Sequence, residues 1–309
     1  MMKLKTAAAG MVLIACALPL FAQRGDTTSA QTVVTVLPKS GEAAPLQQQD
    51  LKVWADGKES TITQWQALRG DHAGLEFVIL IDDSARSSIG LQLNDLSKFI
   101  QSLPPTASVG VAYMQNGRAA FAQNPTADHA LAARAIRITG GAPGSSASPY
   151  FCLSDLAKHW PSQNPNNRRE VLMVTDGVDR YSPRYDPEDP YLQAAITDSQ
   201  KAGLIVYSIY FRDTGRLDRS GYETNAGQSL LTQVAQGTGG NLYYQGLSNP
   251  VSFLPFLEDL SKRLENQYEL GFTAPTKPKQ ELVQLKVKTD VGHVSIDAPQ
   301  RVPVGGARD

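Results

Sequence analysis

The stretch EFVILIDDSARSSIG, residues 76–90, joins an apolar segment to a polar loop. Its continuous hydrophobic run, residues 77–81, is typical of a parallel strand that is covered on both faces of its sheet. The run ends at Asp82 and Asp83, and Ser84 and Arg86 follow closely. Ligands of open α/β sheets bind beyond the carboxyl ends of the strands, so a binding site is expected at this junction.

A second apolar run ends in the same way. REVLMVTDG, residues 169–177, carries Thr175 and Asp176 directly after its hydrophobic part. Because the carboxyl ends of parallel strands meet at one edge of a sheet, we expect Asp82 and Asp176 to lie at the same edge. Two strands that deliver acids to one edge indicate a site more sharply than either acid alone.

Residues 74–265 alternate between buried strands and amphipathic helices. In residues 90–103, for example, the apolar side chains recur at helical spacing with polar residues between them. Alternation of this kind predicts a doubly wound α/β domain, with a mostly parallel, Rossmann-like sheet and helices on both faces.

Short β segments flank this domain on both sides. Residues 31–68 contain a strand, an Asp-Gly turn and a second strand, which is the usual hairpin pattern. Residues 266–303 alternate as half-exposed antiparallel strands do. Neither segment can bury a core alone. We therefore expect them to pair into one small β-sandwich that carries the α/β domain as an insertion.

The N-terminal residues have the pattern of a targeting segment. Lys3 and Lys5 precede an apolar run that ends at Ala22, which predicts a signal peptide over residues 1–22 and export to the periplasm or the exterior. The alternative is a lipid anchor in the envelope, because LIAC resembles a bacterial lipobox with Cys16 as the acylated residue. No later segment has the roughly 20 consecutive apolar residues that a membrane span needs.

Composition narrows the class of function. The chain has 309 residues, 41% of them apolar, and a formal charge of -1. This balance fits a globular protein and does not favour nucleic acid or an anionic membrane as partner. Cys152 is the one other cysteine, which excludes a disulfide framework and fits a buried structural thiol.

The two strand ends together resemble the von Willebrand factor type A (VWA) domain. LIDDSARS, residues 80–87, followed by VLMVTDG, residues 171–177, is similar to its metal-ion-dependent adhesion motif. Three further segments, 46–65, 237–245 and 265–275, resemble the VWFA-related acidobacterial domain family, in which short β segments flank the central domain. The resemblance implies that the edge of the sheet binds a partner protein through a divalent cation such as Mg²⁺.

The resemblance also assigns motif positions, and two of them are altered. Asp82 and Ser84 match the first two positions, and Asp176 matches the final acid. The mid-domain threonine of the motif is replaced by Ser148, with Ser146 as the alternative. The third position, normally serine, is Arg86.

Arg86 puts the cation in doubt, because a guanidinium offers donors only and stays charged. Our first interpretation is a metal-free site in which Arg86 bridges Asp82 and Asp176 by charge-assisted hydrogen bonds. The alternatives are a retained weak Mg²⁺ site, since Mg²⁺ readily keeps several waters, a shifted loop in which Ser87 or Ser88 supplies the hydroxyl, or ordinary strand-end acids.

The loop after Asp176 is the second candidate for recognition. GVDRYSPRYDPEDPYLQ, residues 177–193, interleaves tyrosines and arginines with acids and prolines. Tyr and Arg are enriched at binding hot spots, which favours recognition by the loop over a merely rigid connection. The candidate binding residues in it are Arg180, Tyr181, Arg184 and Tyr185.

Signals for an enzyme are weak in this sequence. The four histidines fall in separate segments without paired ligand spacing, and neither a GxSxG elbow nor a P-loop is present. We therefore predict an exported, non-catalytic protein-binding or adhesion module with a degenerate metal site. The alternatives are a Mg²⁺-dependent adhesion module and a hydrolase that uses Asp82 and Asp176 on a metal.

Overall fold

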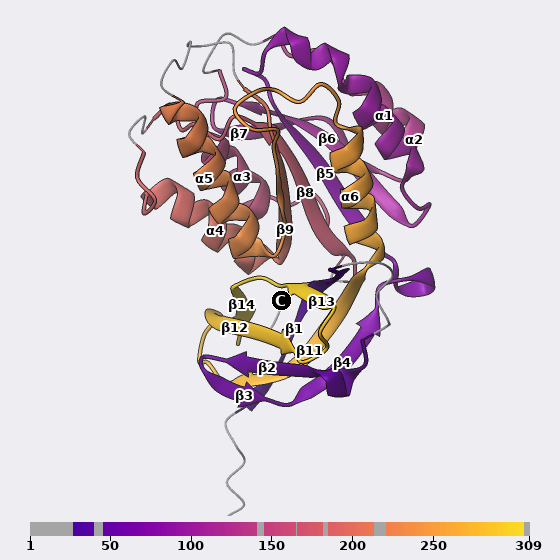
Figure 1. The fold of residues 1–309 in the computed structure, drawn as a ribbon, viewed down its shortest axis with the longest axis vertical. Coiled ribbons are helices and arrows are strands. Elements are labelled where there is room, and N and C mark those ends of the chain that lie inside the picture. Colours follow the sequence, from indigo (N-terminus) through magenta and orange to yellow (C-terminus); the bar gives the residue numbers. More distant parts are fainter. Residues whose placement is uncertain are drawn as a thin grey trace, which may run out of the picture.

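The structure is a computed structural model, and it describes residues 27–39, 46–140, 145–164, 166–181, 185–212 and 221–305. It consists of an α/β domain and a β-sandwich, stacked along the long axis of the molecule (Figure 1). The predicted signal peptide and Cys16 lie outside the described residues.

The α/β domain is built on a sheet of six strands in the order β10-β9-β8-β5-β6-β7. Neighbouring strands are parallel except β7, which runs antiparallel to β6. The chain winds from β5 to one side and later returns to β8 on the other, so β5 and β8 flank the topological switch point. The strands are β5 (Leu75–Asp82), β6 (Ala107–Gln115), β7 (Arg118–Thr126), β8 (Arg168–Thr175), β9 (Leu204–Tyr210) and β10 (Leu242–Tyr243).

Helices cover both faces of this sheet, and β5 shows why. All eight of its residues are buried. Phe77, Ile79 and Ile81 enter one core with α1, α2 and α6, while Val78 and Leu80 enter the other with α3, α4 and α5. The predicted doubly wound fold is confirmed. The helices are α1 (Leu93–Ser102), α2 (His129–Arg134), α3 (Pro149–Lys158), α4 (Pro190–Ala202), α5 (Tyr222–Thr238) and α6 (Leu254–Glu265), with short 3-10 turns η1 (Gln48–Asp50), η2 (Gly70–His72) and η3 (Ser87–Leu91).

The β-sandwich joins segments from both sides of the α/β domain. Its sheets have the orders β13-β1-β11-β4 and β14-β12-β2-β3. Their inner faces share one core that includes Val34, Val53, Leu270 and Val283. Small β pieces thus complete each other, as expected from their inability to bury a core alone. The strands are β1 (Thr27–Pro38), β2 (Leu51–Ala55), β3 (Lys58–Ser60), β4 (Ile62–Ala67), β11 (Gln267–Pro275), β12 (Glu281–Thr289), β13 (Val294–Asp297) and β14 (Arg301–Val304).

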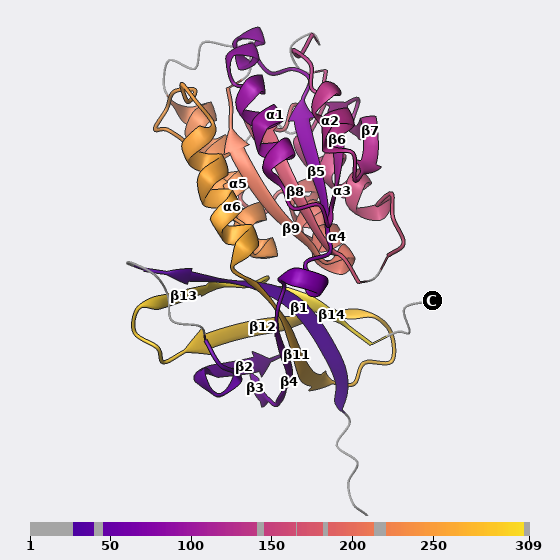
Figure 2. The ribbon, with the colours of Figure 1, turned by 90° about the vertical axis from the view of Figure 1, so that its right-hand side faces the viewer.

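Buried polar side chains lie where the sandwich meets the amino ends of the parallel strands (Figure 2). Arg168 Nε lies 3.2 Å from Glu170 Oε1, and both side chains are buried. Gln267, the first residue of β11, donates to the Tyr207 hydroxyl at 3.3 Å. Burial raises the pKa of Glu170 to about 6 despite the nearby Arg168.

Candidate strand-end site

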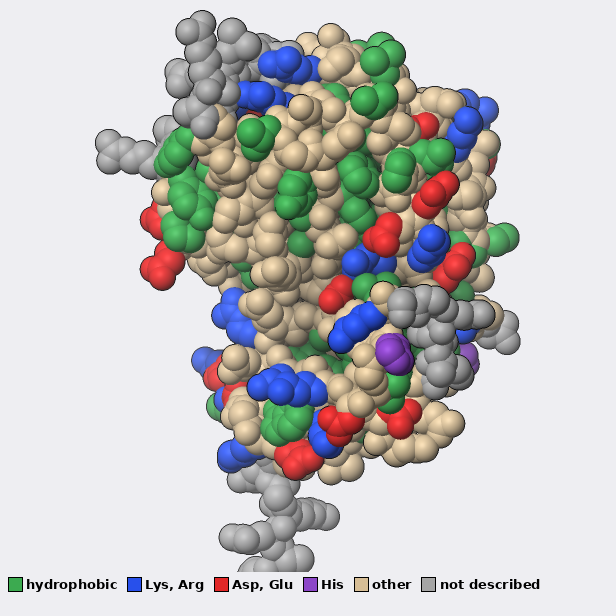
Figure 3. Space-filling view, in the orientation of Figure 1, with side chains coloured by type: hydrophobic (Ala, Val, Ile, Leu, Met, Phe, Trp, Pro, Cys, Tyr) green, Lys and Arg blue, Asp and Glu red, His purple; other side chains and the backbone are tan. Residues whose placement is uncertain are grey.

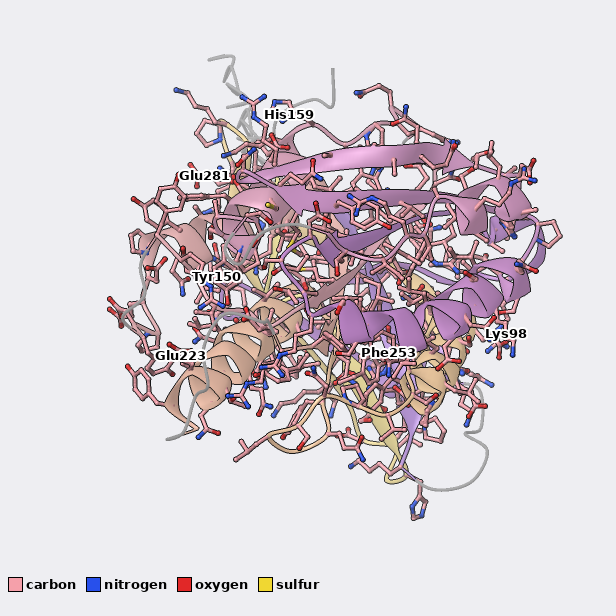
Figure 4. The ribbon with its side chains drawn as sticks, turned by 90° about the horizontal axis from the view of Figure 1, so that it is seen from above. Lys98, Tyr150, His159, Glu223, Phe253 and Glu281 are labelled. Carbon is pink, nitrogen blue, oxygen red and sulfur yellow. The ribbon has the colours of Figure 1, made fainter. Side chains whose placement is uncertain are left out.

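The carboxyl ends of β5 and β8 place four polar side chains beneath the upper edge of the α/β domain. Asp82, Ser84, Thr175 and Asp176 are all buried, with exposed fractions of 3%, 2%, 0% and 6%. The two strands are hydrogen-bonded neighbours as far as Ile81 and Val174, so their final residues emerge side by side. The structure therefore brings both predicted strand ends to one edge, seen from above in Figure 4.

Asp82 is held by three hydrogen bonds from its neighbours. Its Oδ1 accepts the Ser84 backbone N–H at 3.0 Å and the Ser84 hydroxyl at 2.6 Å. Its Oδ2 accepts the Thr175 hydroxyl at 2.7 Å. Burial raises the pKa of Asp82, and these hydrogen bonds oppose the rise. Thr175 is the last residue of β8, and its hydrogen bond to Asp82 ties β8 to β5. The sequence pattern gave no role for this hydroxyl.

Of the two candidate serines in the mid-domain loop, Ser146 lies next to the site. Its hydroxyl is 3.5 Å from the Ser84 hydroxyl. Ser148 instead occupies the N-cap of α3, where its hydroxyl faces the Phe151 N–H at 3.5 Å. Ala147 between them has φ 65°, a left-handed conformation that turns the two serines to different neighbours. The prediction was that Ser148, rather than Ser146, lies at the site. In the structure Ser146 lies there, and Ser148 caps α3.

Asp176 pairs with an arginine from its own loop. Its Oδ1 accepts the Val178 N–H at 2.9 Å, and its Oδ2 accepts Arg180 Nη2 at 2.8 Å. The Arg180 backbone N–H bonds the Ala147 carbonyl at 3.1 Å, which fixes the loop against the segment that carries Ser146. Arg180 was predicted to contact a partner, and the structure gives it a role inside the site.

The arginine that the structure pairs with Asp176 is Arg180. Arg86 is instead the residue that precedes η3, and its carbonyl accepts the Ile89 N–H at 2.9 Å. Arg180 is four residues from Asp176 and reaches it through the turn of its own loop, and the bridge by Arg86 stays a prediction.

Asp83 faces a different group of residues from Asp82. It accepts Arg137 Nη1 at 2.9 Å and Gln115 Nε2 at 2.7 Å. Burial would raise the pKa of Asp83, but the bonds from Arg137 and Gln115 outweigh it and lower that pKa. Arg137 also stacks on the ring of Tyr113, 3.9 Å from its centroid. This ion pair fixes the loop beside the site. Nothing in the sequence predicted that Arg137 would pair with Asp83.

The tyrosine-rich loop is only in part exposed. Tyr181 is 67% exposed and contacts the Phe151 ring, with centroids 5.2 Å apart. Tyr185 is half-buried, and its hydroxyl lies 2.9 Å from that of Ser229 on α5. Arg184 lies outside the described residues. The Tyr181 side chain thus lies largely at the surface of the protein, whereas Tyr185 holds the loop to α5.

Large apolar side chains are exposed around this edge. Leu91 of η3 is 79% exposed, and Val251, just before α6, is 85% exposed. Gln92 connects their two segments by donating to the carbonyls of Pro250 and Val251. Other large apolar side chains with at least half of their surface exposed are Ile138, Tyr222, Tyr244, Leu247 and Leu254.

The residues fit a divalent cation only in part. Ser84 and Ser146 offer two neighbouring hydroxyls, which are suitable oxygen ligands for Mg²⁺. The third motif position is Arg86, which has no oxygen to offer. Asp176, the second acid, has one carboxylate oxygen bound to Arg180. The site thus differs from the adhesion motif at its third position, and Arg180 occupies one oxygen of its second acid.

Cys152 lies in surroundings that make its thiol unreactive. Cys152 is buried on α3, its thiol faces the Ser146 carbonyl at 3.6 Å, and burial raises its pKa well above the ordinary value. A thiol of this kind stays protonated and unreactive. In the part of the chain that the structure describes, no helix has both the length and the apolar character to cross a membrane.

Comparisons with known proteins find similar proteins only among the solved structures. The sequence matches no protein-family model, and no curated protein matches it significantly. An aerotolerance-related membrane protein from Bacteroides fragilis is 15% identical over 62% of this chain and 98% of its own, with a TM-score of 0.44. BatB from Bacteroides thetaiotaomicron is 16% identical over 62% of this chain and 97% of its own, with a TM-score of 0.40. A mussel byssus thread matrix protein with a zinc-occupied MIDAS motif is 15% identical over 64% of this chain and 48% of its own, with a TM-score of 0.42.

The strand order decides the fold independently of these structures. Five parallel strands, one antiparallel edge strand at β7 and a switch point between β5 and β8 make up the sheet. The polar residues that follow β5 and β8 meet at that switch point, with Ser146 beside them. The α/β domain has the doubly wound fold that the resemblance implies, and its polar strand-end residues meet at the switch point of the sheet.

Proposed function

We propose that this protein is an exported, non-catalytic binding module that holds a partner protein at the strand-end edge of its VWA domain. In this proposal the metal site is degenerate, and the edge binds its partner without a bridging cation. Arg180 and Arg86 supply positive charge where a cation would otherwise be held.

The observation that carries the proposal is the 2.8 Å ion pair between Arg180 and Asp176. Asp176 is buried, so its carboxylate needs a charged or hydrogen-bonding partner. A charge-assisted bond from a guanidinium satisfies that need without a metal. Arg86 at the third motif position removes a further oxygen ligand, so two changes in one site point the same way.

The surface around the site supports a protein as the partner. Exposed apolar and tyrosine side chains, among them Leu91, Tyr181 and Val251, surround buried polar groups. Interface hot spots commonly combine aromatic and apolar anchors with arginine. Contiguous exposed apolar surface on a soluble domain commonly marks an interaction site.

A Mg²⁺-dependent adhesion module is the second candidate. The 3.5 Å approach of the Ser84 and Ser146 hydroxyls favours it, because this pair would suit two adjacent ligand positions. Thermal melting distinguishes the two candidates. We expect the melting temperature of the parent protein to be the same in Mg²⁺, in Mn²⁺ and in EDTA.

The variant Arg180→Gln frees the Asp176 carboxylate and should create a response to Mg²⁺. A ligand present at 100 times its Kd stabilises a protein by about 2.7 kcal/mol, which is roughly 5 °C or more in a domain of this size. Arg134→Gln, which removes an exposed arginine of α2, is the matched control and should give no response. A shift of several degrees with Mg²⁺ in the parent protein would establish the metal-dependent candidate instead.

The binding face itself is tested by capture. Immobilised parent protein should retain specific proteins from an envelope extract, and the double variant Leu91→Ser and Val251→Ser should retain much less of them. Lys98→Gln, on the exposed face of α1, is the control and should behave as the parent does. Equal retention by the edge variant would show that the edge is not the binding face.

A further inference from the structure

A second polar cleft lies at the waist of the molecule, at the opposite end of the sheet from the strand-end site. Its volume is about 420 Å³. The sandwich contributes β1 and β14 to its walls, and the α/β domain contributes the start of β8 and the turn from α4 to β9. Figure 3 shows Lys and Arg side chains at the waist between the two domains, with Asp and Glu side chains among them.

The charge in this cleft is positive on balance, because its four cationic residues outnumber Glu269, Glu170 and Glu76. Four cationic residues and one acidic residue, Glu269, line it, although the whole chain has a formal charge of -1. Arg168 is compensated by Glu170, and Arg169 lies 3.9 Å from Glu76. The remaining two cations, Lys201 and Arg301, form no ion pair with another described residue. They leave a local excess of positive charge that suits an anionic ligand.

The other lining residues suit a peptide. Carboxamides both donate and accept hydrogen bonds, as a peptide backbone requires, and the described lining combines them with aliphatic residues and includes no aromatic ring on which a sugar could stack. Gln200 is 3% exposed, and its buried Oε1 has no hydrogen-bond partner in the structure. The lining carboxamide residues are Gln31, Gln163, Asn166, Asn167, Gln200 and Gln280.

A strand with an open edge borders the cleft. β1 pairs with β11 over Thr27–Thr35 on one side, but with β13 only over Thr35–Pro38 on the other. Its residues 27–34 therefore have no second strand partner among the described residues, and residues 31–33 line the cleft. Figure 2 shows β1 running along this side of the sandwich. An open strand edge can accept an extended peptide by main-chain hydrogen bonds.

We propose that the waist cleft binds an extended, acidic peptide segment of a partner protein. The peptide backbone lies along β1, and its carboxylates meet Lys201 and Arg301, with Arg169 at the far wall. A neighbouring cleft, of about 920 Å³, shares Arg301, so a longer peptide continues past Arg301 along α4 and α5. Its other polar lining residues are Asp56, which pairs with Lys277, and Gln193, Gln233, Gln236, Gln284 and Gln300. This site is separate from the strand-end edge and does not depend on the function proposed for it.

The test measures binding of a fluorescent octapeptide of alternating Glu and Val by anisotropy, in low salt. We expect this peptide to bind and the alternating Lys and Val peptide not to bind. Raising the salt concentration should weaken binding, because exposed charges are screened. Equal binding of the two peptides, or none of the acidic one at millimolar concentration, would overturn the proposal.

Variants locate the site on the protein. The double variant Lys201→Gln and Arg301→Gln should lower the affinity at least tenfold, since charge-assisted hydrogen bonds are the stronger kind. Lys98→Gln, which removes an exposed lysine of α1, and Asp176→Ala, at the strand-end site, should leave it unchanged. A fall in affinity with Asp176→Ala and not with the double variant would place the peptide at the strand-end edge. Circular dichroism verifies that each variant is folded.

Two modified ligands test the class and the binding mode. In an extended peptide, alternate N–H groups point to opposite edges. N-methylation of the residues whose N–H groups face β1 should weaken binding tenfold or more. N-methylation of the other set should leave the affinity unchanged. Equal affinity of both methylated peptides and the unmethylated peptide would exclude strand addition to β1. Tetragalacturonic acid carries carboxylates without a peptide backbone, and binding as tight as that of the peptide would show that the cleft takes acidic glycans instead.

Discussion

At the scale of single residues, Asp82 holds the strand-end site together through three hydrogen bonds. Asp82→Ala would leave buried hydroxyls of Ser84 and Thr175 without that acceptor, and we expect a loss of about 2–4 kcal/mol in the free energy of unfolding. Asp82→Asn keeps an acceptor for Ser84 and a partner for Thr175. It also removes a buried carboxylate, and burial raises the pKa of that group. We expect it to cost under about 1 kcal/mol.

Urea denaturation of the three proteins checks this prediction at pH 7. If Asn at position 82 costs as much as Ala, the negative charge itself is required, which would favour a bound cation at the site.

The sequence could predict the acids of the site but not all their partners. Asp82 and Asp176 follow apolar runs, so their common edge was predictable from the strand pattern. The choice between Ser146 and Ser148 depends on the left-handed turn at Ala147, which no residue pattern announces. Pro149 gave one usable signal, because serine before a proline at the first helical position is typical of an N-cap.

At the scale of elements, α5 approaches the site loop so closely that only glycine fits. A Cβ at Gly227 would lie 2.0 Å from the Asp176 carbonyl oxygen. In an exposed helix interior, Gly→Ala ordinarily stabilises by about 1 kcal/mol. Here the clash reverses the sign, and we expect Gly227→Ala to lower the free energy of unfolding by about 2–4 kcal/mol and to displace Asp176 from Arg180.

Chemical denaturation measures this effect, with Gln236→Ala as control. Gln236 is exposed on the same helix, and its substitution should change stability by less than about 0.5 kcal/mol. A stabilised Gly227→Ala protein would mean that the helix and the site loop separate easily.

The helices and strands themselves were largely predictable, because their periodicity reflects burial on one or both faces. β10 is an exception, since it covers Leu242–Tyr243 alone. β10 pairs with β9 at the border of the sheet, where only Tyr243 is buried, so its length depends on tertiary contacts rather than on a hydrophobic run. The helix contact at Gly227 had no signal in the sequence.

At the scale of the whole molecule, Glu170 makes stability depend on pH. Its folded-state pKa of about 6 lies above the ordinary value of 4.5, so the folded protein binds the proton more tightly than the unfolded chain. The resulting stabilisation is fully present below pH 4.5 and is lost as the pH rises through 6. A shift of this size corresponds to about 2 kcal/mol.

Glu170→Gln removes this titration and retains hydrogen-bonding capacity toward Gln267 and Tyr207. Urea denaturation between pH 4 and pH 7 should show the free energy of unfolding of the parent protein falling by about 2 kcal/mol relative to that of the variant. Parallel curves for the two proteins would show that the pKa of Glu170 is the same in the folded and unfolded states. The pairing of the flanking β segments was predictable from their amphipathic alternation, whereas this buried glutamate was not, because its strand reads as an ordinary polar-to-apolar transition.

The pairing of β1 with β11 has a consequence for how the chain folds. It joins Thr27 to Pro275, so the strands must find each other across the whole α/β domain. Once the α/β domain has folded, its two ends, at β5 and α6, are held at fixed positions. Only the short segments that lead from these ends to β1 and β11 must then lose conformational entropy when the two strands pair. We therefore expect the sandwich to assemble after the inserted domain, and a variant that slows the folding of the α/β domain to delay both.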